Sequence, residues 1–80
     1  MGRKNDNVTC DIVESLGVLH TSGTGWTKEL NRVSWNGGDI RFDLREWDPN
    51  HDKCSKGATF TEEEAKQIIE LLTKYFQENE

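Results

Sequence analysis

Residues 26–47 read WTKELNRVSWNGGDIRFDLREW and contain the strongest local structural signal of the chain. In this stretch, Asn36-Gly37-Gly38 separates two runs that are rich in β-branched, aromatic and alternating apolar residues. Asn-Gly and Gly-Gly both supply the positive φ angles that a tight β-hairpin turn needs. The stretch therefore predicts two antiparallel strands, over residues 26–35 and 39–47.

The flanking segments extend this hairpin into a sheet that is followed by a helix. Residues 9–20 have the β-branched composition of a further strand, in which Gly17 predicts a bulge or bend, and residues 57–60 resemble a short fourth strand. Thr61-Glu-Glu-Glu64 has the form of a helix capping box. The predicted fold class is α+β: a four-stranded antiparallel meander followed by one C-terminal helix. Apolar residues at three- and four-residue steps define the buried side of that helix, namely Ile68, Ile69, Leu72, Tyr75 and Phe76. This side can pack on the sheet, on a twin helix, or partly on each.

The length and composition predict one small domain that needs a partner. Leu, Ile, Val and Phe make up only 17 of the 80 residues, so the core is thin. We therefore expect a disordered segment over residues 1–8, a single domain over residues 9–78, and a homodimer joined through the apolar side of the helix. No apolar run is long enough to cross a membrane, and no secretory signal is visible near Met1. The expected location is the cytoplasm.

The two cysteines and two histidines favour no cofactor. Cys10, His20, His51 and Cys54 offer four potential zinc ligands, but structural zinc sites usually show two closely spaced pairs, which this chain lacks. Residues 48–52 are acidic but have neither the glycine nor the distal glutamate of a calcium loop. The sequence therefore predicts two reduced thiols and no metal.

The net charge of −5 argues at first against a nucleic-acid partner. The excess negative charge is nevertheless concentrated in residues 61–80, which carry two basic and six acidic groups, whereas residues 26–60 carry six of each. Side chains alternate between the two faces of a strand, and a two-residue turn would place Val33 and Trp35 on the face of Ile40, Phe42 and Leu44. The opposite face would then collect cations and indoles, with two lysines of the following loop extending the track: Trp26, Lys28, Arg32, Arg41, Arg45, Trp47, Lys53 and Lys56.

A surface of this kind is suited to single-stranded nucleic acid. Arginine and lysine neutralise phosphates, and tryptophan stacks on bases largely without regard to sequence. The simplest alternative is a solvated sheet surface in which Arg32 or Arg41 pairs with Asp43 across the strands. A module that docks a protein partner on its exposed tryptophans, or one that binds RNA, also stays open. No nucleophile and base stand at a recognisable catalytic spacing, so the chain is not expected to be an enzyme.

Three stretches together resemble a known family: RVSWN at residues 32–36, DLREWDP at residues 43–49 and KGATFTEEE at residues 56–64. They are similar to the C-terminal domain of transcriptional positive cofactor four, and most of all to its small bacterial members of the YdbC type. The resemblance implies a homodimer whose sheets form a groove for single-stranded DNA, and a role in transcription, repair or replication. It places Arg45 and Lys56 at positions where the family uses basic contacts, and Trp47 at the aromatic end of its run.

Overall fold

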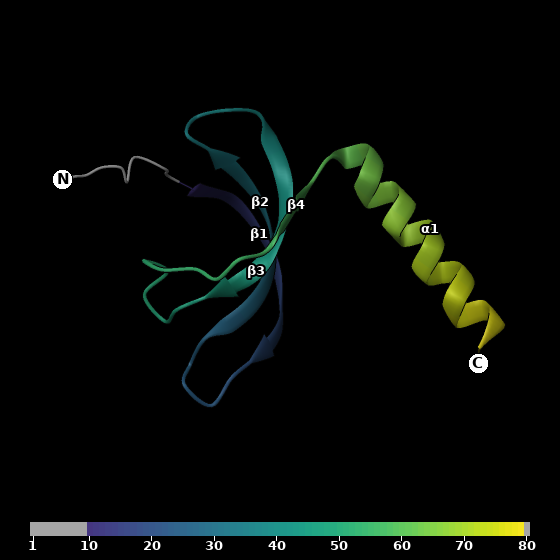
Figure 1. Ribbon diagram of the computed structural model, residues 1–80, viewed down its shortest axis with the longest axis horizontal. Coiled ribbons are helices and arrows are strands. Elements are labelled where there is room, and N and C mark those ends of the chain that lie inside the picture. The colour runs from purple at the N-terminus through teal and green to yellow at the C-terminus, as the bar shows by residue number, and fades with distance from the viewer. Residues whose placement is uncertain (1–9, 80) are drawn as a thin grey trace.

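The computed structural model describes residues 10–79 and shows a four-stranded antiparallel sheet followed by one helix (Figure 1). The strands lie in chain order across the sheet, as a meander, and the predicted α+β architecture is therefore confirmed. Their bounds lie within a residue of the predicted ones, whereas the segment 1–8 lies outside the described residues. The elements are β1 (Cys10–Thr21), β2 (Thr27–Trp35), β3 (Ile40–Trp47), β4 (Ala58–Phe60) and α1 (Glu62–Glu78).

Strand β1 is irregular and helps to curl the sheet. Its pairing with β2 shifts register between Ile12 and Glu14, between Ser15 and Gly17, and between Val18 and His20. The second shift confirms the bulge predicted at Gly17. Because bulges bend a strand and increase its twist, the sheet is strongly curved, and Figure 1 shows its connecting loops on the side opposite α1.

The loop between β2 and β3 differs from the predicted two-residue turn by one residue. Asn36 and Gly37 both have positive φ angles, 52° and 74°, and the Gly38 N–H donates to the Trp35 carbonyl over 2.8 Å, as in a tight hairpin turn. The ladder then resumes with Ser34 opposite Ile40 rather than with Ser34 opposite Asp39. One residue is therefore inserted between the turn and the strand, in the manner of a β-bulge.

This insertion reverses the predicted assignment of β2 to the two faces, because a one-residue slip moves every side chain of a strand to the other side. Leu30 stands opposite Leu44, and Glu29 stands opposite Arg45. We call one side the polar face; it carries Thr27, Glu29, Asn31, Val33, Trp35, Arg41, Asp43, Arg45 and Trp47. The other side is the apolar face; it carries Lys28, Leu30, Arg32, Ser34, Ile40, Phe42, Leu44 and Glu46.

The buried core lies on the polar face, inside the curl of the sheet. Val33 and Trp47 are the buried apolar residues among those described, with 0% and 4% exposure. They lie among three buried polar residues: Glu29, Asn31 and Asp43. The apolar face is more open, and Ile40 on it is 47% exposed.

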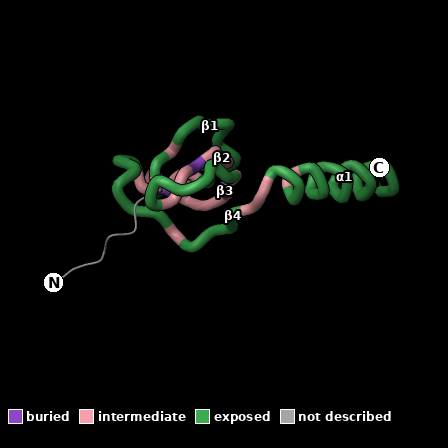
Figure 2. Tube along the Cα trace, turned by 90° about the horizontal axis from the view of Figure 1, so that it is seen from above, coloured by how far each residue is buried: buried purple, intermediate pink, exposed green. Residues whose placement is uncertain are grey.

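Helix α1 begins as predicted but packs less than predicted. The Thr61 hydroxyl accepts from the Glu64 N–H over 3.1 Å, and the Thr61 N–H donates to the Glu64 carboxylate over 2.8 Å, which confirms the capping box. Beyond this first turn the helix projects away from the sheet, and no residue of it is buried (Figure 2). No helix within residues 10–79 has the length and apolarity needed to cross a bilayer.

Candidate nucleic-acid interface

The centre of the polar face is an ion pair between Arg45 and Asp43. The Arg45 Nε and Nη2 atoms each donate to a different oxygen of the Asp43 carboxylate over 2.7 Å, and Asp43 is fully buried. The Thr59 hydroxyl donates to the same carboxylate over 2.9 Å. The hydrogen bonds that the guanidinium donates to Asp43 raise the pKa of Arg45 above its ordinary value, so the guanidinium stays charged. The hydrogen bond from Thr59 connects this pair on β3 to β4.

Further contacts of Arg45 connect it to the end of β2 and to the segment before β4. Its guanidinium carbon lies 4.7 Å from the centre of the Trp35 ring, which is a cation–π contact. Its Nη1 donates to the Ser55 carbonyl over 3.3 Å. With a side chain only 10% exposed, Arg45 is fully engaged within the protein, and Asp43 compensates its charge. Arg45 thus positions Trp35 and the loop rather than presenting a free cation.

Gly57 allows the segment before β4 to cross close to β3. A Cβ atom at this position would lie 2.3 Å from both the Leu44 carbonyl oxygen and the Arg45 Cβ, so only glycine fits. This close approach fixes Lys56, the preceding residue, beside Arg45. In the Lys56-Gly57 pair, the glycine is therefore required sterically, and the lysine supplies the positive charge.

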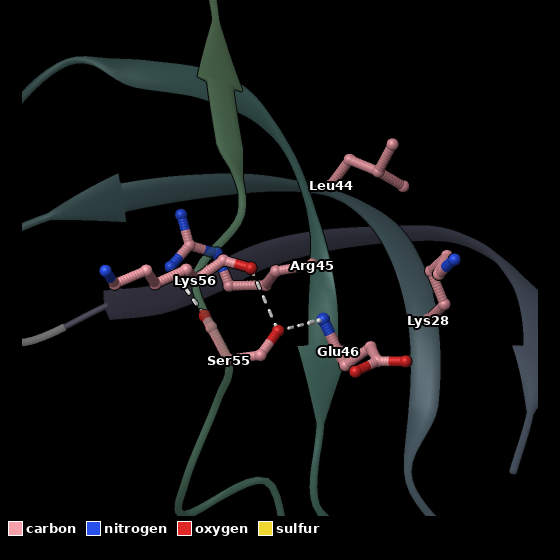
Figure 3. Close-up of a pocket in the computed structure, with 6 residues that line it drawn as sticks. All are labelled: Lys28, Leu44, Arg45, Glu46, Ser55 and Lys56. Atoms are coloured by element: carbon pink, nitrogen blue, oxygen red, sulfur yellow. Dashed lines mark hydrogen bonds between the residues drawn. The ribbon is translucent and has the colours of Figure 1, made fainter.

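A pocket of about 330 Å³ at this crossing brings together three of the predicted binding residues (Figure 3). Its lining is Lys28, Leu44, Arg45, Glu46, Ser55 and Lys56. The Ser55 hydroxyl accepts from the Glu46 N–H over 3.1 Å and donates to the Lys56 carbonyl over 3.0 Å, which holds the rim in place. Two lysines thus flank a small hollow whose only acidic lining residue is Glu46.

A second cluster on the polar face surrounds Glu29, which is 5% exposed. Its carboxylate accepts from the Thr27 hydroxyl, from the Asn31 Nδ2 over 3.1 Å, and lies 2.8 Å from the His51 Nε2. Burial raises the pKa of Glu29, but these three hydrogen bonds outweigh burial and hold the pKa below its ordinary value. The His51 ring also stacks on Trp47, with ring centres 5.7 Å apart and an angle of 24° between the planes.

The loop between β3 and β4 presents His51 to this cluster. The Asp48 carboxylate accepts from the Lys53 N–H over 2.9 Å, and the Asp48 carbonyl accepts from the His51 N–H over 2.9 Å. His51 itself has a positive φ of 58°, which turns the chain sharply at this point. The loop therefore has its own hydrogen bonds, while His51 reaches over the polar face and Lys53 is exposed.

The structure corrects the predicted grouping of the binding residues on one face. Lys28 and Arg32 lie on the apolar face, where the Arg32 guanidinium sits 5.2 Å above the centre of the Phe42 ring. Trp47 is on the polar face but is buried rather than exposed, because the sheet curls around it and His51 covers it. Arg41 shares the polar face with Trp47 and is exposed.

The other predicted residues lie on the loops around the polar face. Lys53 and Lys56 are exposed, and Trp26 is half-buried in the turn before β2, where its backbone N–H donates to the Ser22 hydroxyl over 3.1 Å. Trp35 was assigned to the apolar face by the sequence, yet it is half-buried on the polar face. A bulge at Gly38 and Asp39, had it been included in the predicted hairpin, would have placed Trp35 on the polar face.

No group of three or more His, Cys, Asp or Glu side chains suited to a metal ion occurs among residues 10–79. Cys10 stands opposite Trp35 in the ladder, and Cys54 is exposed in the loop before β4; both thiols are free. Burial raises the pKa of the Cys10 thiol to about 11. Cys10 is therefore protonated, and hence unreactive, at neutral pH.

Comparison with known proteins agrees with the fold. The chain matches the family described as Transcriptional Coactivator p15 (PC4) over residues 22–71, which span β2 to β4 and the first part of α1. It is also 39% identical over 71 residues to an uncharacterized protein of Treponema pallidum (strain Nichols), an alignment that covers 89% of this chain and 84% of the relative. The protein belongs to the PC4 family, a family of DNA-binding proteins that are not enzymes. The resemblance seen in the sequence is thereby confirmed.

Proposed function

We propose that this protein binds single-stranded DNA, largely without sequence preference, as a homodimer that acts in transcription regulation or in DNA repair and replication. Membership of the PC4 family is the observation that carries this proposal. A bacterial protein with this role would work in the cytoplasm, in association with the nucleoid. It needs no cofactor, because phosphate neutralisation and base stacking are both performed by side chains.

The accessible groups around the polar face support this function. Arg41, Lys53 and Lys56 are exposed cations, and Trp26 and Trp35 are partly exposed indoles. We infer that the cations contact phosphates while the two indoles stack on bases. Lys28 and Arg32 extend the contact surface onto the apolar face, and Lys28 does so through the pocket that it shares with Lys56. In this arrangement Arg45 and Trp47 lie beneath the contact surface and hold its residues in position.

The homodimer is supported by apolar surface that one protomer leaves uncovered. A cleft of about 580 Å³ runs between the apolar face and α1, lined on the sheet side by Leu30, Phe42 and Leu44 and on the helix side by Ile68, Ile69 and Leu72. Ile69, Leu72, Tyr75 and Phe76 are each more than half exposed. Most of the stability of a helix in a protein comes from packing of its apolar side, and α1 buries none of its residues within one protomer. The apolar side of the same helix from a second copy fits this cleft, because a two-fold interface pairs like surfaces.

Binding is tested by fluorescence anisotropy with labelled oligo-dT over a series of salt concentrations. We expect micromolar or tighter affinity that falls as the salt concentration rises. The logarithm of the association constant should fall against the logarithm of the salt concentration with a slope of about 0.7 for each phosphate contacted. Competition with RNA and with duplex DNA establishes whether the protein prefers single-stranded DNA. The absence of binding at roughly 50 mM salt would contradict the proposal, since electrostatic contacts are strongest at low salt.

Two substitutions locate the surface. Arg41→Ala and Lys56→Ala each remove an exposed cation, so we expect weaker binding to oligo-dT and a smaller salt slope. Lys74→Ala, on the far part of α1, removes the same charge and is the matched control, with binding unchanged. Equal losses in all three variants would show that net charge, and not this surface, determines the affinity.

The dimer is tested separately by light scattering during size-exclusion chromatography. Leu72→Glu places a charge in the cleft and is expected to yield monomers or unfolded chains. Glu70→Gln, on the same helix, is expected to keep the dimer. A monomeric wild-type protein at micromolar concentration would refute the dimer without affecting the DNA-binding test.

A further inference from the structure

The contact between His51, Trp47 and Glu29 has the geometry of a bound nucleobase. A planar ring stacks with its face on an indole while one of its edge nitrogens lies 2.8 Å from a buried carboxylate. Proteins that bind single strands stack bases on aromatic side chains, and carboxylates read bases by accepting hydrogen bonds from their edges. Any flat ring that takes the place of His51 would therefore meet both partners at once.

His51 is the part of the cluster that can leave. Its side chain is 44% exposed, whereas that of Glu29 is 6% exposed and Trp47 is buried. The loop keeps two separate hydrogen bonds, from the Lys53 N–H to the Asp48 carboxylate and from the Glu46 N–H to the Ser55 hydroxyl, and displacement of His51 leaves both in place. Moving the ring outward would expose the face of Trp47 on which it rests.

The same face of the sheet contains unused hydrogen-bonding capacity. Within residues 10–79, the buried side-chain atoms that lack a hydrogen-bond partner include Asn31 Oδ1, an acceptor, and Trp47 Nε1, a donor. Buried polar atoms are nearly always paired, so unpaired atoms require an explanation such as a missing partner. Asn31 is also the residue that donates to Glu29, which places one of these atoms within the cluster itself.

We propose, on the basis of the proposed single-stranded DNA binding, that Trp47 and Glu29 form a guanine-selective subsite whose place His51 occupies in the free protein. An ionised carboxylate offers about four acceptor positions. Thr27 and Asn31 use two of those of Glu29, and His51 uses a third, so its departure leaves two.

Guanine is the base that matches two free acceptor positions. Its N1–H and its amino group point in the same direction and can donate together to one carboxylate. Adenine and cytosine present their amino group beside an acceptor nitrogen, and thymine presents its N–H between two carbonyl oxygens, so each of them would also direct a lone pair at Glu29. A bidentate contact of this type discriminates between bases by about 1–3 kcal/mol, which is a factor of roughly five or more in affinity.

The test compares oligo-dT strands of about twelve nucleotides that differ at one central position, within the usual site size of such proteins. Anisotropy is measured for wild-type protein with thymine, inosine or guanine at that position. We expect the guanine strand to bind about fivefold or more tightly than the thymine strand. Inosine, which lacks the amino group, should lie between them. This series varies the DNA alone, so it does not depend on the folding of any variant.

Glu29→Gln supplies the protein-side test, since it keeps the shape of the side chain but replaces one acceptor oxygen with a donor. We expect it to reduce the guanine advantage, which is the ratio of the affinities for the guanine and thymine strands, to less than about twofold. Glu78→Gln, an equal charge change at the exposed end of α1, is the matched control and should keep the advantage. Equal binding of the guanine and thymine strands to wild-type protein, or a guanine advantage that survives in Glu29→Gln, would overturn the subsite alone. Failure of the wild-type protein to bind any strand would overturn the DNA-binding proposal together with the subsite.

Discussion

Replacing Asp43 by alanine is expected to lower the free energy of unfolding by about 3–5 kcal/mol, which is the usual cost of breaking a buried ion pair from one side. Asp43 is 0% exposed and accepts three hydrogen bonds, two from Arg45 and one from Thr59. The substitution leaves the Arg45 charge nearly enclosed, at 10% exposure, without its counter-ion. It also removes the acceptor of the hydrogen bond that the Thr59 hydroxyl on β4 donates to β3.

This loss is large in relation to the whole protein. Small domains are stable by roughly 5–15 kcal/mol, and one with so few buried apolar residues belongs near the lower limit. We therefore expect Asp43→Ala to be largely unfolded at moderate urea concentrations. The assay is urea unfolding followed by tryptophan fluorescence at a fixed protomer concentration, because dimer formation makes stability depend on concentration.

Two further variants show whether the ion pair is the cause. Asp39→Ala removes the same charge from the exposed hairpin loop and should change stability by less than about 0.5 kcal/mol. Asp43→Leu combined with Arg45→Met replaces both charges with apolar groups and should recover most of the loss, since no buried charge is left unpaired. A loss below about 1 kcal/mol for Asp43→Ala, or no recovery in the double variant, would refute this reasoning.

Three more predictions follow from the packing, the helix cap and the cysteines. Gly57→Ala should destabilise by about 1–3 kcal/mol in the same urea assay, because its Cβ would lie 2.3 Å from the Leu44 carbonyl oxygen, while Gly23→Ala meets nothing within 4 Å and should be neutral. Thr61→Ala should cost about 1 kcal/mol through loss of the capping box, and Thr61→Ser should keep most of it; circular dichroism during thermal unfolding measures both. At pH 8 iodoacetamide should modify Cys54 well before Cys10, whose pKa of about 11 leaves it almost entirely protonated, and the Cys10 rate should rise as the pH approaches 11. Peptide mass spectrometry reads the two sites separately, and equal rates at pH 8 would contradict the protected environment of Cys10.

The sequence predicted the elements of this fold well because each has a local signal. The capping box at Thr61 and Glu64, the Asn36-Gly37 turn and the bulge at Gly17 all depend on residues close together in the chain. Such signals are determined by backbone preferences and nearby hydrogen bonds, which a single sequence contains. The strand bounds therefore came within a residue of those observed.

The site was predicted less well because its arrangement depends on pairing between strands. Asn36 and Gly37 form the expected turn, but the extra residue after it reverses the side of Lys28, Arg32 and Trp35. The sequence offers no direct sign of that extra residue, since Gly-Gly and Asn-Gly both fit a turn of two residues. Both two-residue turns give a strand register that differs by one residue from the observed one. That difference assigns the β2 side chains to the wrong faces of the sheet.

The burial of Trp47 depends on contacts that are distant in sequence. The curl that encloses it arises from bulges in β1, and the ring that covers it belongs to His51, which Glu29 on a different strand holds in place. The alternation along β3 placed Trp47 on the correct face but contains no information about curvature. Its exposure could be found only from the assembled sheet.

The single inserted residue after the Asn36-Gly37 turn has a consequence for comparing relatives. A member of the family that lacks this residue would show the other set of β2 side chains to the inside of the sheet, even if its strand sequences were the same. A one-codon deletion in the hairpin would thus change the chemistry of the concave surface as much as several point mutations. Residue-by-residue transfer of binding roles across this hairpin is therefore justified only between relatives whose loops have equal length.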